Sequence, residues 1–147
     1  SNVTASPDQN DNTSIFLLTL GASQNPIKLT SYKGSNQSPK FSPDNLSIAY
    51  LQASSEDAYD MYDLKQLAVI DIKTKSIKLL TKNYDRSIDN IIWANDSKSV
   101  YALVEDDRTQ NIMQINASSG EVKSFTSEMA VYNTLDINEN GSMVTLW

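Results

Sequence analysis

The chain has 147 residues, of which 39% are hydrophobic, and its formal net charge is −6. This length is enough for one domain with a core of its own. The acidic balance and the scattered placement of the 12 Lys and Arg residues argue against nucleic acid as a partner. No apolar run approaches the ~20 residues of a membrane span. No basic segment followed by an apolar one opens the chain, so we expect no signal peptide in it.

Cysteine and histidine are both absent from the sequence. Disulfides, thiolate metal sites and cysteine nucleophiles therefore cannot form, and neither can a Ser-His-Asp triad or a histidine-ligated metal site. We expect no catalytic residue, no metal site and no cofactor site in this chain. If the full-length protein is a hydrolase, its catalytic groups lie outside these residues.

The predicted elements begin after a polar segment. Residues 1–14 are rich in Asn, Asp, Ser and Thr, which predicts a flexible lead-in. The nearly continuous apolar run Ile15–Leu20 predicts a strand that is covered on both faces. Residues 26–30 are short and alternating, which favours an edge strand. Ser38–Leu51 then predicts two strands joined by a tight turn.

Both units recur along the chain. The hairpin of residues 38–51 returns at 90–103 and 133–146, and the unit of residues 67–81 returns at 111–126. The threonines that close one unit recur at intervals of 51 and 45 residues, at Thr30, Thr81 and Thr126. The large apolar residues before the turns of the other unit recur at intervals of 52 and 44 residues, at Phe41, Trp93 and Ile137.

A period in the mid-forties with four short strands per repeat is typical of a β-propeller blade. We therefore predict an all-β fold of four-stranded antiparallel blades, in which Phe41, Trp93 and Ile137 pack between blades. Helix is a poor alternative, because no segment keeps apolar residues at 3.6-residue spacing for more than about two turns.

The hairpin turns occupy the same place in each copy. Asn-Gly is the strongest two-residue hairpin signal, because both central residues need a positive φ. Asp and Asn tolerate that conformation, whereas Ser97 suits it less, which leaves another turn type open for the second copy. The predicted turn residues are Asp44 and Asn45, Asp96 and Ser97, and Asn140 and Gly141.

The residues Ser-Pro-Lys-Phe-Ser-Pro-Asp-Asn at 38–45 and LAVIDIKTKSIKLLT at 67–81 resemble a known repeat. It builds TolB-type propellers and the N-terminal propellers of prolyl oligopeptidase-like serine peptidases, including dipeptidyl and acylaminoacyl peptidases. The resemblance covers Ile15–Trp147. It is close only in the first copy, because Asn95 and Glu139 stand where the motif has proline.

This resemblance implies a non-catalytic propeller that caps an α/β-hydrolase domain and restricts access of peptides to its active site. The Gly-x-Ser-x-Gly elbow of such a domain does not occur in these 147 residues. The alternative that it implies is a periplasmic protein-interaction scaffold like TolB. A periplasmic or secreted location is expected, and a cytoplasmic one stays open.

With A as the innermost strand of a blade, the predicted order is C-D, A-B-C-D, A-B-C-D, A-B. Residues 15–147 would thus form about three blades, one of them split between the termini, whereas a ring takes ~4–8. Either the chain is a fragment of a longer protein, or two copies form a homodimer that completes a six-bladed ring. The residues expected at that interface are Ile15, Phe16, Leu17, Leu18, Met143, Val144 and Leu146.

Two acidic groups are further candidates. The first, which could bind Ca²⁺ or a peptide amino terminus, consists of Glu56, Asp57, Asp60 and Asp63. Its spacing does not match an EF-hand loop, so a solvated loop is favoured, although the interleaved Tyr59, Met61 and Tyr62 indicate packing on a neighbour. The second consists of Glu105, Asp106, Asp107 and Arg108. Paired carboxylates do acid–base work only in a pocket that perturbs them, so a polar hairpin end is favoured.

Overall fold

The structure is a computed structural model that describes residues 12–21, 25–57, 60–106, 108–126 and 131–146. Residues 1–11 of the expected lead-in lie outside this range, as do Tyr59, Asp107 and Trp147. In the part of the chain that is described, all regular structure is β-strand. Near its start, Thr13 Oγ1 donates a 2.7 Å hydrogen bond to the carbonyl oxygen of Asn36, so the chain already contacts the sheets there.

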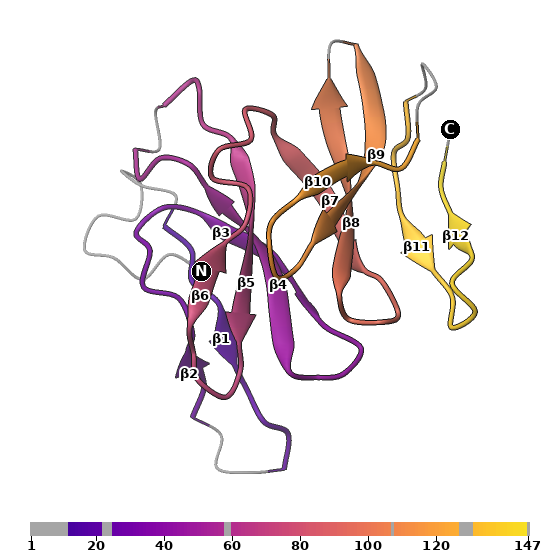
Figure 1. Cartoon of the computed structure of the whole chain (residues 1–147). Coiled ribbons are helices and arrows are strands. Elements are labelled where there is room, and N and C mark those ends of the chain that lie inside the picture. The colour runs from indigo at the N-terminus through magenta and orange to yellow at the C-terminus, as the bar shows by residue number, and fades with distance from the viewer. Residues whose placement is uncertain (1–11, 22–24, 58–59, 107, 127–130, 147) are drawn as a thin grey trace.

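The strands form four antiparallel sheets that fan out side by side (Figure 1). The first sheet pairs β1 (Phe16–Leu17) with β2 (Ile27–Lys28). The second, in spatial order, consists of β3 (Asn36–Phe41), β4 (Ser47–Ala53), β5 (Lys65–Asp71) and β6 (Ile77–Leu79). The third consists of β7 (Ile88–Trp93), β8 (Ser99–Asp106), β9 (Thr109–Asn116) and β10 (Val122–Ser124). The fourth pairs β11 (Asp136–Ile137) with β12 (Met143–Val144). The predicted all-β fold of propeller blades, with two whole blades between two halves, is confirmed.

Strands of the two middle sheets contain apolar runs because each of these sheets packs against a neighbouring sheet on both of its faces. In β4, Ile48 and Tyr50 pack with Ile15 of the first sheet. Ala49 and Leu51 belong to the cluster shared with the third sheet. Side chains alternate between the two faces of a strand, so a strand covered on both faces is apolar at successive positions.

The largest hydrophobic cluster lies between the second and third sheets. Leu51 and Leu67 of the second sheet meet Ile91, Trp93 and Val104 of the third, and each is at most 4% exposed. Burying one such side chain contributes roughly 1.5–3 kcal/mol. Smaller clusters fill the other two gaps between sheets. Packing between neighbouring sheets therefore stabilises the fold, because a single four-stranded sheet could not bury these side chains alone.

The three turns between A and B strands share one conformation. φ is positive only at the second residue of each predicted pair, at 58° for Asn45, 58° for Ser97 and 80° for Gly141. The N–H of each donates to the carbonyl three residues earlier. The expectation of two residues with positive φ is therefore wrong. The bond encloses an ordinary four-residue turn, and the residue that closes it takes the positive φ.

The three residues expected to pack between blades differ in burial. Trp93 is 4% exposed and Ile137 is half-buried. Phe41 is 55% exposed, so its expected packing is wrong in this chain. Phe41 pairs with Ile48 and shares its face, which points toward the first sheet. Among the described residues that sheet consists of the outer strands β1 and β2, so none of these residues supplies an inner strand to cover the Phe41 ring.

Candidate functional site

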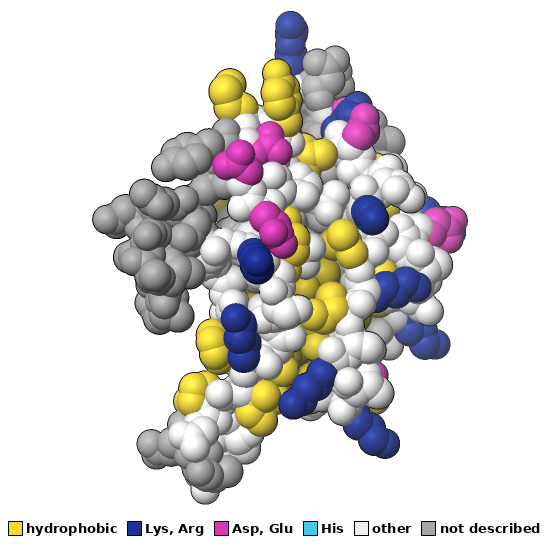
Figure 2. Space-filling model, turned by 90° about the vertical axis from the view of Figure 1, so that its left-hand side faces the viewer, with side chains coloured by type: hydrophobic (Ala, Val, Ile, Leu, Met, Phe, Trp, Pro, Cys, Tyr) yellow, Lys and Arg dark blue, Asp and Glu magenta, His cyan; other side chains and the backbone are white. Residues whose placement is uncertain are grey.

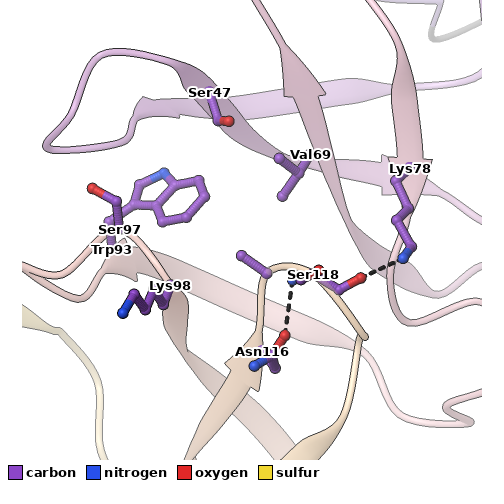
Figure 3. A pocket seen from close by; sticks show the side chains of 9 residues that line it. Ser47, Val69, Lys78, Trp93, Ser97, Lys98, Asn116 and Ser118 are labelled. Carbon is purple, nitrogen blue, oxygen red and sulfur yellow. Dashed lines mark hydrogen bonds between the residues drawn. The ribbon is translucent and has the colours of Figure 1, made fainter.

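A hollow of about 480 Å³ opens between the second sheet and the turns of the third sheet (Figure 3). The third sheet contributes its A–B turn and its C–D turn, and the second sheet contributes residues of β4, β5 and β6. The residues that line it are Ser47, Val69, Lys78, Trp93, Ser97, Lys98, Asn116, Ala117 and Ser118. None of these was singled out by the sequence except Trp93 and Ser97, because lysine and serine in polar turns carry no signal of a shared site.

The indole of Trp93 forms one wall of the hollow, at the end of β7. Its Nε1 donates a 3.0 Å hydrogen bond to the carbonyl oxygen of Lys40 on β3. A buried indole N–H needs such a partner. The bond therefore fixes the ring in place and joins the innermost strands of the two sheets.

The opposite wall is the turn that follows β9. Asn116 Oδ1 accepts hydrogen bonds from the backbone N–H of Ser118 at 2.9 Å and of Ser119 at 2.8 Å. This is the local bond that suits Asn to turns. The ammonium of Lys78 on β6 donates to the carbonyl oxygen of Ser118 (Figure 3). The third sheet's turn is thus tied to the outer strand of the second sheet.

The two A–B turns are also joined to each other. The backbone N–H of Asp44 donates to Ser97 Oγ at 3.1 Å. The Asp44 carboxylate accepts from the Ser42 hydroxyl at 2.6 Å and from the Leu46 N–H at 3.0 Å. These bonds favour the charged carboxylate and hold the pKa of Asp44 below its ordinary value of 3.8. Asp44 therefore stays ionised and keeps its turn folded at neutral pH.

The chemistry open to this hollow is binding rather than catalysis. Its described lining offers two ammonium groups, Lys78 and Lys98, beside serine hydroxyls, but no carboxylate and no imidazole that could serve as a base. The Lys78 ammonium is already engaged by Ser118. The arrangement can hold a hydrogen-bonding or anionic group, and it also acts as the joint between two blades.

The first acidic group forms a surface loop, as expected. Asp63 Oδ1 accepts from the N–H of Ser54 at 2.7 Å and from the N–H of Ser55 at 3.1 Å. These carboxylate bonds shape the loop, and the described residues contain no group of three or more potential ligands that could hold a metal ion. Met61 is 92% exposed and Tyr62 is 86% exposed, so the expected packing of this loop on a neighbour is wrong within the chain.

The second acidic group also lies at a hairpin end, between β8 and β9. Asp106 Oδ1 accepts a 3.0 Å hydrogen bond from Nε of Arg86, whose guanidinium also binds Asp85. Both ion pairs are exposed, so each contributes little to stability. The Glu105 side chain is exposed. The group is a solvated hairpin end in which the described carboxylates are not paired with each other for acid–base work.

The innermost strands carry a matched irregularity that sequence reasoning missed. The register shifts between Gln37 and Lys40 on β3 and at the equivalent place on β7. Ser38 has a φ of 55° and Asn90 a φ of 31°. Bulges of this kind re-aim side chains. Asn tolerates a positive φ and could have been suspected, whereas Ser38 gave no signal.

No family model matches the chain. Dipeptidyl-peptidase 5 of Porphyromonas gingivalis is 31% identical over 126 residues, which are 86% of this chain and 18% of the relative. TolB from Acinetobacter baumannii superposes with a TM-score of 0.63 at 19% identity, over 87% of this chain and 30% of that structure. This chain has the fold of a stretch of TolB-like propeller and is similar in sequence to dipeptidyl-peptidase 5.

Another solved structure shares the same arrangement of blades. A puromycin hydrolase superposes with a TM-score of 0.66 at 14% identity, over 82% of this chain and 20% of that structure. At these identities the superpositions show the fold of the propeller alone. The chain spans less than a fifth of the length of the dipeptidyl peptidases that it matches, at 18% and 12%. The hollow therefore belongs to a propeller whose relatives contain much more than these blades.

Proposed function

We propose that this propeller stretch is a non-catalytic part of a prolyl oligopeptidase-like serine peptidase, in which it restricts access of peptides to a hydrolase domain. The match to dipeptidyl-peptidase 5 over 86% of the chain carries the proposal. Because the sequence has no histidine, a Ser-His-Asp triad cannot come from these residues. The catalytic groups would then be supplied by residues beyond this chain, and the propeller would act as a filter.

A filter must stay rigid while substrates pass, and the contacts between the second and third sheets support this. The Lys65 ammonium lies 2.7 Å from the Asp89 carboxylate across the gap between the sheets. Lys78 bonds to Ser118 across the same gap, nearer the rim. Together with the buried Trp93, these contacts tie the sheets at both ends and in the core. Two blades joined in this way would open as one body rather than separately.

The test uses the full polypeptide that contains this propeller. We expect it to hydrolyse a chromogenic dipeptidyl substrate and short peptides, but to leave a folded protein of ordinary size uncut. The double variant Lys65→Met and Lys78→Met should raise cleavage of long substrates relative to the dipeptidyl substrate, because the sheets separate more easily. Lys28→Met is the control, since the Lys28 side chain is exposed. Hydrolysis of the dipeptidyl substrate by the isolated 147-residue chain would contradict the proposal.

A TolB-like scaffold is the second candidate, favoured by the superposition on TolB over 87% of the chain. In this role the propeller would bind a protein partner, and a periplasmic or secreted location suits either role. Among the described residues no helix is long and apolar enough to cross a membrane. The sequence that the gene encodes after Trp147 distinguishes the two candidates. A Gly-x-Ser-x-Gly elbow followed by Asp and His would favour the peptidase, and further blades ended by a stop would favour the scaffold.

A further inference from the structure

Lys78, in the hollow beside Trp93, stands at a position where the repeat does not require a lysine. It pairs with Val69 and lies three residues before the threonine that closes its unit. The residue in the same place of the first sheet is Ile27, and in the third sheet it is Lys123. An apolar side chain therefore serves equally well at this position of the outer strand, and the architecture of the blade does not explain Lys78.

Lys98, the other lysine of the hollow, also departs from its equivalents in the repeat. It directly follows the residue with positive φ in the A–B turn of the third sheet. Leu46 holds this place in the second sheet and Ser142 in the fourth. Of the gaps between the described sheets, only the one between the second and third has lysine at both positions. The two lysines are thus a property of this hollow and not of the fold.

The two lysines give the hollow a local positive charge. In Figure 3 they lie on opposite sides of it, and the described residues that line it include no carboxylate. Figure 2 shows the side of the molecule that lies at the left of Figure 1, where Lys and Arg side chains are spread mostly singly over the surface. In a chain with a net charge of −6, a concave site with two ammonium groups concentrates negative ligands locally.

The base of the hollow is apolar. It is formed by the ring of Trp93 together with Val69 and Ala117, which are both half-buried and pack against the largest hydrophobic cluster. The hollow measures about 480 Å³, which falls within the ~300–1,000 Å³ of small-molecule sites. Such sites combine an apolar lining with a few polar groups that fix the orientation of the ligand. This hollow has that composition.

We propose that the hollow binds a small carboxylate with a planar apolar body. The apolar body contacts the base, and the carboxylate accepts hydrogen bonds from the Lys78 ammonium. That ammonium has three donors, of which the carbonyl oxygen of Ser118 uses one. Two donors are left for a ligand. Lys98 adds a second positive charge on the opposite side, where its side chain is exposed.

The acidic side chains beside the hollow are engaged by their own turns. Asp96 Oδ1 accepts a 2.9 Å hydrogen bond from the backbone N–H of Lys98. The Asp44 carboxylate is held by Ser42 and Leu46. Neither aspartate lines the hollow, so the charged side chains that a ligand meets there are positive. The site depends on these two blades and does not rest on the proposed peptidase role.

NMR locates the ligand, because the indole N–H of Trp93 is a probe in the wall of the hollow. In the ¹⁵N-labelled variant Trp147→Phe, Trp93 is the one tryptophan left. Titration with 2-naphthoate should shift its indole signal and the amide signal of Ser118 to saturation. Uncharged 2-naphthamide should bind about tenfold more weakly, because it lacks the charge-assisted hydrogen bond. Equal affinity for the two compounds, or no shift of the indole signal, would overturn the proposal.

A lysine substitution tests which group holds the carboxylate. Lys78→Met should weaken 2-naphthoate binding by about tenfold and leave the affinity for 2-naphthamide unchanged. The amide matters because Lys78 also ties the two sheets together, and a hollow that had merely loosened would lose both compounds alike. Lys123→Met is the matched control, since Lys123 holds the same place in the third sheet but does not line the hollow. Equal loss of both compounds in Lys78→Met, or equal loss of 2-naphthoate in the two variants, would contradict the assignment.

Discussion

The hydroxyl of Thr81 accepts a 2.8 Å hydrogen bond from the backbone N–H of Leu67, fourteen residues earlier. The same bond recurs in the first sheet at 3.0 Å and in the third at 3.1 Å. In each case the threonine side chain satisfies a backbone donor within a C strand or, for Ile15, directly before it. The regular spacing of these threonines in the sequence therefore reflects a hydrogen bond that recurs in each repeat.

Replacing Thr81 with valine should lower the free energy of unfolding by roughly 1–3 kcal/mol, because the Leu67 N–H is left buried without a partner. Thr81→Ser keeps the hydroxyl and should lose less. Urea denaturation of the two variants against wild type measures the difference. Equal losses would show that the methyl group, and not the hydrogen bond, makes this position important.

Two glycines in positive φ should respond differently to alanine. An added Cβ at Gly120, with a φ of +82°, would clash with the carbonyl oxygen of Leu80. At Gly141, with a φ of +80°, the same atom meets nothing within 4 Å. Gly141→Ala should cost about 1–2 kcal/mol for the backbone conformation alone, and Gly120→Ala should cost clearly more. Thermal unfolding of both variants checks the order, which equal losses would contradict.

Trp93 and Phe41 occupy the same position of successive inner strands but should differ in energetic weight. Trp93→Ala should cost about 3–5 kcal/mol, because it empties the largest cluster and frees the Lys40 carbonyl. Phe41→Ala should change stability by less than about 1 kcal/mol, since an exposed ring loses little burial. The measurement is urea denaturation of each variant against wild type. A large loss at Phe41 would show that residues outside the described range cover it.

Tyr50 should weaken the fold at alkaline pH. Burial raises the pKa of its phenol from 10.0 to about 12. Since the folded chain holds this proton more tightly, its stabilising effect is complete below pH 10 and is lost as pH rises toward 12. Within that window the free energy of unfolding should fall by about 1.4 kcal/mol per pH unit. Tyr50→Phe removes this contribution, and pH-dependent urea denaturation of the pair should show a shallower alkaline decline for the variant.

The sequence predicted the blades well because repetition and strand alternation are local signals. The runs around Ile48 and Ile70 are apolar at successive positions, which follows from cover on both faces. Each predicted hairpin is present in the structure. Even the half sheets at the two ends could be foreseen from the order of units along the chain.

What could not be foreseen depends on contacts between repeats. The exposure of Phe41 follows from which half of the first blade is present, and no pattern at residue 41 records that. The hollow joins Lys78 to Ser118, 40 residues apart, through a backbone carbonyl that has no sequence signature. The positive φ at Ser38 belongs to a bulge, and a serine in the sequence does not predict a bulge.

The central claim is that separate four-stranded sheets stack face to face, and the indole N–H of Trp93 tests it most directly. It bonds to Lys40, 53 residues away on another sheet, a contact that only stacking can make. NMR of the folded chain should show nuclear Overhauser effects from the Trp93 indole proton to protons of β3. Intact cross-strand effects within each sheet, without any from this indole proton to β3, would contradict the account.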